Sequence, residues 1–193
     1  MKNIVLYGGS FNPPCSHHRE LVHAIASNPF FHEIVVIPCG RRGDKGYVDN
    51  DLRMRMAEYA FAEILGVVLD MRNLKDDIFT SNYHLEALYQ APDTVLWHAI
   101  GSDLLVRDDK GLNPIQRRWT EGPFIWENFS FLVVPRRGYP VVSELLPKQQ
   151  VVLQGEFSGS STDVRKAIRE GAPFKHLVDL KTYDLIVKGN LYR

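Results

Sequence analysis

The sequence predicts an α/β fold in which a parallel sheet carries helices on both faces. Two observations predict this class: short apolar runs alternate with segments of helical periodicity, and glycine or proline ends several of the apolar runs. Strands that alternate with helices are joined by right-handed crossovers, which make the strands parallel. The chain contains no internal repeat or low-complexity tract that would suggest another architecture.

The expected elements follow one another in this alternating order. We expect strands over residues 3–7, 34–37, 67–69, 94–100, 131–134 and 151–153. We expect helices, the first with Ser16 as its N-cap, over residues 18–26, 51–63, 83–89, 162–170 and 179–188. Ligands of such sheets bind beyond the carboxyl ends of the strands, and unusual residues gather after Tyr7, Pro38 and Ile100.

Length and charge fit one ordinary globular domain. We expect a single domain over residues 1–193, with residues 107–122 as an excursion over the surface and residues 160–193 as a C-terminal helical part. Lys plus Arg and Asp plus Glu number 23 each, so no global field attracts nucleic acid or an anionic membrane. Any anion site must therefore be local.

The cysteines and the apolar runs bear on the compartment. Cys15 and Cys39 do not make a disulfide framework, and no run is long enough to span a bilayer, so we expect a cytoplasmic protein. No metal-ligand pattern such as C-x-x-C or H-E-x-x-H is present, so we expect no metal held by the protein itself. The sequence leaves open whether the chain forms a homo-oligomer.

A glycine-rich segment follows the first strand and reads Gly8-Gly9-Ser10-Phe11-Asn12-Pro13-Pro14-Cys15-Ser16-His17-His18. Glycines let a backbone approach a ligand, because no Cβ stands in the way. Backbone N–H groups in this segment and at the start of the next helix favour an anion, and His18 lies near that start. The segment predicts a phosphate site, with a glycine-rich turn carrying exposed histidines as the structural alternative.

A second cluster precedes a later helix and reads Ser160-Ser161-Thr162-Asp163-Val164-Arg165. Hydroxyls and amides at a helix start favour a phosphate, and Arg165 lies one turn into the helix. Alone, the cluster fits a plain N-cap with an arginine that faces solvent. Together with the first segment it predicts the several donors that a triphosphate needs.

These two segments resemble the paired motifs of the nucleotidylyltransferase superfamily, whose fold is a Rossmann-like parallel sheet. Residues 8–18 are similar to the pattern G-G-T-F-D/N-P-P-H-x-G-H of its adenylyltransferase branch, and residues 160–165 are similar to S-S-T-x-I-R. Further matches to bacterial nicotinate mononucleotide adenylyltransferases follow in order along nearly the whole chain, at residues 38–45, 52–56, 81–88, 100–104, 134–139 and 189–193.

Two positions and one short segment depart from the family pattern. Cys15 stands where the family has the first histidine of its motif, and His17 stands where it has a glycine, whereas His18 occupies its expected place. Residues 41–44 read Arg-Arg-Gly-Asp where the family has Pro-Pro-His, with Lys45 in register. Because a thiol is a weak donor, these departures bear on rate and substrate rather than on fold.

The resemblance implies adenylyl transfer from ATP to the phosphate of nicotinate or nicotinamide mononucleotide, with pyrophosphate released in a step of NAD biosynthesis. It implies a catalytic role for His18, Lys45 and Arg165. It implies an ATP site that also includes Gly8, Gly9, Ser10, Phe11, Cys15, Gly101, Asp103, Ser161 and Thr162. Mg²⁺ is expected to arrive with ATP, because the sequence shows no dedicated carboxylate cage.

The acceptor side is expected to hold a pyridine ring. Asn12, Lys45 and Ser81 are the expected polar contacts by resemblance. An aromatic platform suits such a ring, and Trp119 and Trp126 flank the polar excursion. Either tryptophan fits a plug that packs a loop onto the core equally well.

Two alternatives remain open at the level of sequence. The first is that the chain is a transferase that adenylates another phosphate, such as phosphopantetheine, or that it is a cytidylyltransferase. Alternatively, it is a nucleotide-binding protein of the same fold with weak or no catalysis, which Cys15 and His17 favour.

Overall fold

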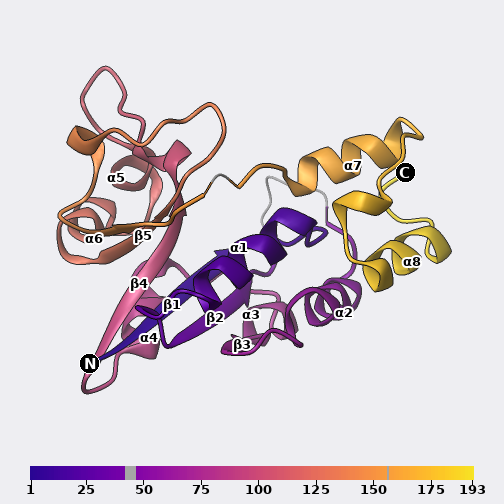
Figure 1. The fold of residues 1–193 in the computed structure, drawn as a ribbon, viewed down its shortest axis with the longest axis horizontal. Coiled ribbons are helices and arrows are strands. Elements are labelled where there is room, and N and C mark those ends of the chain that lie inside the picture. The colour runs from indigo at the N-terminus through magenta and orange to yellow at the C-terminus, as the bar shows by residue number, and fades with distance from the viewer. Residues whose placement is uncertain (42–46, 156) are drawn as a thin grey trace. The chain divides into compact units, whose positions relative to one another are not determined.

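The computed structural model describes residues 1–41, 47–155 and 157–193 and shows an α/β fold (Figure 1). Its six-stranded sheet has the order β3-β2-β1-β4-β5-β6, and the pairs β1–β4, β2–β3, β4–β5 and β5–β6 are parallel. The strands are β1 (Lys2–Gly9), β2 (Glu33–Pro38), β3 (Val67–Leu69), β4 (Thr94–Gly101), β5 (Ser130–Val134) and β6 (Gln149–Val152). The predicted α/β class with a parallel, Rossmann-like sheet is confirmed.

The helices include all five that the sequence predicts, with ends shifted by a few residues. These are α1 (Ser16–Ala26), α2 (Asn50–Phe61), α4 (Asn82–Tyr89), α7 (Ser161–Arg169) and α8 (Leu180–Lys188). Three short helices were not predicted, namely α3 (Arg72–Lys75), α5 (Pro114–Arg118) and α6 (Gly122–Asn128). The 3-10 turns are η1 (Ser102–Leu105), η2 (Ser143–Leu145) and η3 (Lys175–Leu177). Within the described residues no helix has the length and apolar character needed to cross a membrane.

The chain divides into two compact units that are each discontinuous in sequence. The first unit comprises residues 1–7, 29–33 and 80–158, and the second comprises residues 8–28, 34–79 and 159–193. The glycine-rich segment and the Ser160–Arg165 cluster thus belong to the same unit, the second, although they lie far apart in the sequence. The prediction of one domain over residues 1–193 stays a prediction.

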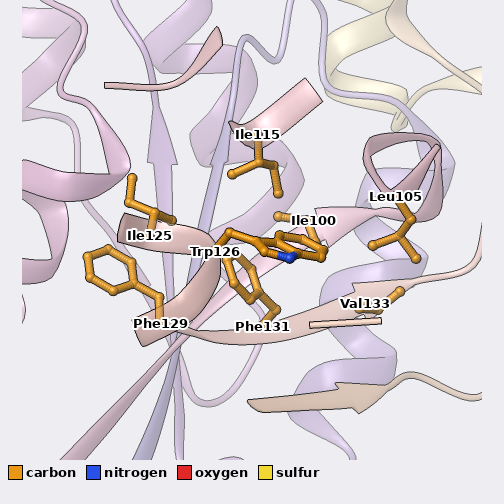
Figure 2. Close-up of a cluster of buried hydrophobic side chains, with 8 residues drawn as sticks. All are labelled: Ile100, Leu105, Ile115, Ile125, Trp126, Phe129, Phe131 and Val133. Atoms are coloured by element: carbon orange, nitrogen blue, oxygen red, sulfur yellow. The ribbon is translucent and has the colours of Figure 1, made fainter. Parts of the chain in front are cut away.

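The first unit is organised around a large apolar core (Figure 2). Strands β4 and β5, the turn η1, helices α5 and α6 and the residue between α6 and β5 supply its buried side chains, which are Ile100, Leu105, Ile115, Ile125, Trp126, Phe129, Phe131 and Val133. Burial of so many large apolar groups is the main favourable term for folding this unit.

Residues 107–122 are more than the predicted surface excursion. They contain α5, whose N-cap Asn113 accepts a hydrogen bond from the Gln116 amide at 2.9 Å. Ile115 on this helix is fully buried in the core of the first unit. The helix was not predicted because the segment is polar and Ile115 is the single apolar anchor of the helix. Five residues are also too few to show a helical period.

Candidate functional site

The two phosphate-binding segments that the sequence predicts meet in the second unit. The Ser161 hydroxyl donates to the Pro13 carbonyl oxygen at 2.8 Å, and Arg165 Nη1 donates to the Asn12 carbonyl oxygen at 2.7 Å. These two hydrogen bonds fix the first turn of α7 beside the loop that follows β1. The structure therefore brings His18, Ser161 and Arg165 into one compact unit.

The first turn of α7 carries the groups that the sequence predicts for an anion site. Ser160 caps the helix by accepting a hydrogen bond from the Asp163 amide at 3.1 Å, so the following residues take up helical geometry. Thr162 is exposed, and its hydroxyl accepts a hydrogen bond from Arg165 Nη2 at 3.1 Å. A helix N-terminus, hydroxyl groups and a guanidinium together can hold the oxygens of a phosphate.

His18 lies in the first turn of α1 and is half-buried. Its Nδ1 accepts a hydrogen bond from the Cys15 backbone amide at 3.1 Å, and its ring meets the Phe11 ring edge-on at a centroid distance of 5.2 Å. A neutral imidazole that accepts at Nδ1 carries its proton at Nε2, which makes Nε2 a donor. The geometry thus suits the predicted phosphate contact.

Cys15, rather than the predicted Ser16, is the N-cap of α1. Ser16 is the first residue of the helix, and its hydroxyl donates to the His176 carbonyl oxygen at 3.0 Å. The Cys15 sulfur lies 2.8 Å from His17 Nδ1 and 3.1 Å from His18 Nδ1. Burial raises the pKa of the Cys15 thiol to about 12, so the sulfur is neutral at pH 7 and puts no negative charge beside a phosphate.

Arg53 is a site residue that the residue-by-residue prediction missed. This residue of α2 is 1% exposed, and its Nη2 donates to the Ser10 carbonyl oxygen at 2.6 Å and to the Cys39 carbonyl oxygen at 2.5 Å. Its guanidinium also stands over the Tyr47 ring, 4.5 Å from the centroid. Burial lowers the pKa of Arg53, yet arginine stays charged. Arg53 therefore holds the loops that follow β1 and β2 in fixed positions.

Tyr192, near the end of the chain, also reaches the site. Its hydroxyl donates to Asn12 Oδ1 at 2.8 Å, and burial raises the pKa of the phenol, so the tyrosine stays neutral. Asn12 was predicted as an acceptor contact, and it is 2% exposed. The side-chain oxygen of Asn12 thus accepts a hydrogen bond from Tyr192, and its backbone carbonyl oxygen accepts one from Arg165.

The remaining residues of the glycine-rich loop take different structural roles. A Cβ at Gly9 would lie only 2.8 Å from the ring of Phe11, which explains why a glycine is needed there. Phe11 has a positive φ of 43° and packs edge-on against Phe61 at 5.2 Å. A Cβ at Gly8 would meet nothing within 4 Å, so packing does not require this glycine and close approach of a ligand remains its predicted role.

In the first unit, Gly101 and Asp103 lie together at the end of β4. The Asp103 carboxylate lies 3.3 Å from Arg136 Nε, and a Cβ at Gly101 would collide with both of these side chains. Asp103 Oδ1, the oxygen of this ion pair, is buried and accepts no hydrogen bond from the residues that the structure describes. A buried carboxylate oxygen of this kind can accept from a hydroxyl group of a nucleoside.

The predicted acceptor residues of the first unit have structural roles of their own. The Ser81 hydroxyl caps α4 and lies 2.8 Å from His84 Nδ1. Trp126 is 6% exposed and tilts against Phe131 in the core, which favours the packing interpretation for this tryptophan. Trp119 packs against the same core but is only partly buried. Lys45 falls outside the described residues.

One group of metal-ligating side chains stands out among the described residues. Cys15, His17 and His18 each offer a ligand atom, and these atoms lie within 4.8 Å of one another. They offer sulfur and nitrogen, whereas Mg²⁺ prefers oxygen. The sequence prediction of no protein-held metal overlooked this group, because the spacing Cys-x-His-His is not a familiar ligand pattern.

Comparisons with known proteins agree with the resemblance seen in the motifs. No family model matches the chain. The chain is 26% identical over 197 residues to a probable nicotinate-nucleotide adenylyltransferase of Acholeplasma laidlawii, with 98% of this chain and 97% of the relative covered. It is 24% identical over 208 residues to a probable nicotinate-nucleotide adenylyltransferase of Clostridium tetani, with 100% of each chain covered. The predicted resemblance is confirmed.

Solved structures show the same fold. Nicotinic acid mononucleotide adenylyltransferase of Plasmodium falciparum complexed with NaAD is similar with a TM-score of 0.80 and 23% identity, covering 100% of this chain and 98% of that chain. The same enzyme complexed with APC is similar with a TM-score of 0.73 and 22% identity, covering 100% and 98%.

Proposed function

We propose that this chain transfers an adenylyl group from ATP to nicotinate mononucleotide or nicotinamide mononucleotide and releases pyrophosphate. One observation carries the proposal: the two segments that resemble the family's phosphate-binding motifs are joined by hydrogen bonds from Ser161 and Arg165. The similarity to nicotinate-nucleotide adenylyltransferases over nearly all of both chains supports nicotinate mononucleotide as the acceptor. The product is a dinucleotide of NAD biosynthesis.

The reaction needs position and charge stabilisation rather than a protein nucleophile. An oxygen of the acceptor phosphate, which is already anionic at neutral pH, attacks the α-phosphorus of ATP. The bond from that phosphorus to the oxygen that bridges to the β-phosphate breaks, and pyrophosphate leaves with its electron pair. Donors aimed at the triphosphate lower the barrier by stabilising the charge that develops on the leaving group.

In this proposal the triphosphate is held by residues of the second unit. His18 donates from Nε2, Arg165 donates from its guanidinium, and the first turn of α7 supplies backbone amides. Lys45 is expected to add a further cation. Mg²⁺ would come with ATP and screen the phosphate charges.

The nucleoside and acceptor contacts are proposed in the first unit. Asp103 Oδ1, which is ion-paired with Arg136 but accepts no hydrogen bond from the described residues, fits a hydroxyl of the ribose. Trp119 fits the pyridine ring better than Trp126, because Trp126 is almost fully buried in the core.

The cytoplasmic location that the sequence led us to expect stays a prediction.

An assay of pyrophosphate release tests the proposal. The purified chain is given ATP and Mg²⁺ with nicotinate mononucleotide, nicotinamide mononucleotide or phosphopantetheine, and CTP replaces ATP in a parallel series. We expect release with ATP and a pyridine mononucleotide. Release only with phosphopantetheine or only with CTP would assign the chain to another branch of the superfamily.

A second candidate function is nucleotide binding with weak or no catalysis. It is favoured by Cys15, because a buried neutral thiol replaces the histidine donor of the family motif. Loss of one preorganised donor can cost about 10²–10³ in rate. We expect Cys15→His to raise turnover at least about tenfold. ATP binding without turnover in both the natural chain and this variant would support the second candidate.

A further inference from the structure

The N-cap and first turn of α1 bring together one thiol and two imidazole rings. The transfer reaction does not need this combination. The Cys15 sulfur lies 2.8 Å from His17 Nδ1 and 3.1 Å from His18 Nδ1, and the ligand atoms of the group lie within 4.8 Å of one another. Among the residues that the structure describes, no other group of three or more such side chains is this close.

We propose that Cys15, His17 and His18 form a binding site for a thiophilic divalent metal ion of the Zn²⁺ class. Thiolate sulfur and imidazole nitrogen are the ligands that Zn²⁺ prefers, and Mg²⁺ prefers neither. Three protein ligands leave the fourth tetrahedral position to water or to an oxygen of a bound anion. The site lies on one helical turn, so it needs no rearrangement of the fold.

The two distances from the Cys15 sulfur to the histidine nitrogens are somewhat shorter than those of a metal site. With metal–sulfur and metal–nitrogen bonds of about 2.3 and 2.0–2.1 Å, tetrahedral geometry separates sulfur and nitrogen by about 3.5 Å. The two contacts made by the Cys15 sulfur must therefore lengthen by roughly half an ångström, which side-chain rotation achieves. His18 Nδ1 exchanges the Cys15 backbone N–H for the metal.

The charge balance of the step is simple. The thiol loses its proton to solvent as the metal–sulfur bond forms, and no oxidation or reduction occurs. The imidazole rings bind through the lone pairs of unprotonated ring nitrogens. One charge of the divalent ion is neutralised by the thiolate, and one positive charge remains at the site.

A cavity lies beside the group. Cys15 lines a cavity of about 310 Å³ together with Glu20 and Asp179, and Arg19 and His23 line it as well. The carboxylates of Glu20 and Asp179 can attract a divalent ion into this cavity.

Absorption spectroscopy with Co²⁺ tests the site without any nucleotide. The full chain is freed of metal under reducing conditions and titrated with Co²⁺, which gives a thiolate-to-metal charge-transfer band when sulfur binds. We expect one ion per chain, and loss of the band when Zn²⁺ is added. Failure to see a thiolate band in the natural chain would overturn the proposal.

Variants assign the ligands. We expect Cys15→Ser to abolish the charge-transfer band and His17→Gln to weaken Co²⁺ binding at least about tenfold. Cys39→Ser is the matched control, because Cys39 is the other buried cysteine, and it should keep the band. A band that survives Cys15→Ser and disappears in Cys39→Ser would place the metal elsewhere and refute the site.

Thermal unfolding keeps the proposal testable if Cys15→Ser folds poorly. A metal that binds only the folded state raises the melting temperature with its concentration. We expect Zn²⁺ to raise the melting temperature of the natural chain and of Cys39→Ser, but not that of His17→Gln. An equal rise in all three would contradict the assignment of His17.

The site has a consequence for activity that rests on the proposed function. A metal ion at His18 Nδ1 replaces the Cys15 backbone N–H that now orients the ring, and the Nε2 donor moves with the ring, so Zn²⁺ should inhibit adenylyl transfer. We expect the Zn²⁺ concentration for half-inhibition to rise at least about tenfold in Cys15→Ser, in line with weaker metal binding. The Co²⁺ titration needs no turnover, so absence of transferase activity and absence of a metal site give separate results.

Discussion

The two compact units hold their candidate residues in different ways. In the second unit, side chains from distant parts of the sequence bond to one short loop: Arg53, Arg165 and Tyr192 contact the backbone or side chains of Ser10 and Asn12. In the first unit, Ser81 caps a helix and Trp126 fills the core. The difference teaches that the predicted phosphate-binding loop is held by hydrogen bonds from distant parts of the chain, whereas the acceptor candidates are also ordinary parts of the fold.

Removal of Arg53 is expected to have the largest effect, because the second unit depends on it. Arg53→Ala leaves the carbonyl oxygens of Ser10 and Cys39 without this donor and should lower the free energy of unfolding by roughly 3 kcal/mol. Urea unfolding measures the change. Arg55→Ala is the control on the exposed face of the same helix, and equal losses in both variants would contradict the account.

A change at Arg165 is expected to act on ATP rather than on the fold. Arg165→Lys keeps the charge but loses the fork that contacts Asn12 and Thr162, so ATP affinity should fall about tenfold. Calorimetric titration with ATP measures it. Arg169→Lys, at an exposed position of the same helix, should bind ATP as the natural chain does. Unchanged affinity in a folded Arg165→Lys protein would remove Arg165 from the ATP site.

A change at Trp119 in the first unit is expected to affect binding of the acceptor alone. Trp119→Leu should raise the KM for the pyridine mononucleotide about fivefold and leave the KM for ATP unchanged, since stacking is worth about 1 kcal/mol. Steady-state kinetics with each substrate varied in turn measures both constants. Trp126→Leu is the contrasting variant and should lower stability without this selective change in KM. The reverse pattern would exchange the roles of the two tryptophans.

The smallest expected effect concerns the contact made by the end of the chain. Tyr192→Phe removes only the hydroxyl that donates to Asn12 Oδ1, and it should lower the free energy of unfolding by about 1 kcal/mol. Tyr139→Phe serves as the control, because Tyr139 is exposed in the first unit. If chemical denaturation finds no difference between these two variants, the hydrogen bond of Tyr192 does not stabilise the loop.

The fold was largely predictable from sequence because most of its strands contain continuous apolar runs. Strand β2 (Glu33–Pro38) is buried along nearly its whole length, as its run of Ile and Val predicts. Short helices such as α5 escaped, because a single anchor, Ile115, shows no periodicity. The prediction of Ser16 as the N-cap of α1 was wrong, because cysteine is not among the residues that usually cap helices.

The site residues within sequence motifs were predictable, whereas the residues that reach the site only through tertiary contacts were not. Arg53 offered a signal, because it lies three, four and seven residues before Met56, Ala57 and Ala60, which are all buried on the same face of α2. An arginine on an apolar stripe indicates a buried, paired charge. Tyr192 offered no such periodicity, since its partner Asn12 lies 180 residues away in the sequence.

The most direct measurement of the central claim is product analysis by mass spectrometry. The purified chain is incubated with ATP, Mg²⁺ and nicotinate mononucleotide, and the dinucleotide and pyrophosphate are quantified together. We expect the two products in equal amounts, and a much lower rate for Arg165→Lys. ATP binding by calorimetry with no dinucleotide from nicotinate or nicotinamide mononucleotide would contradict the proposed transfer reaction.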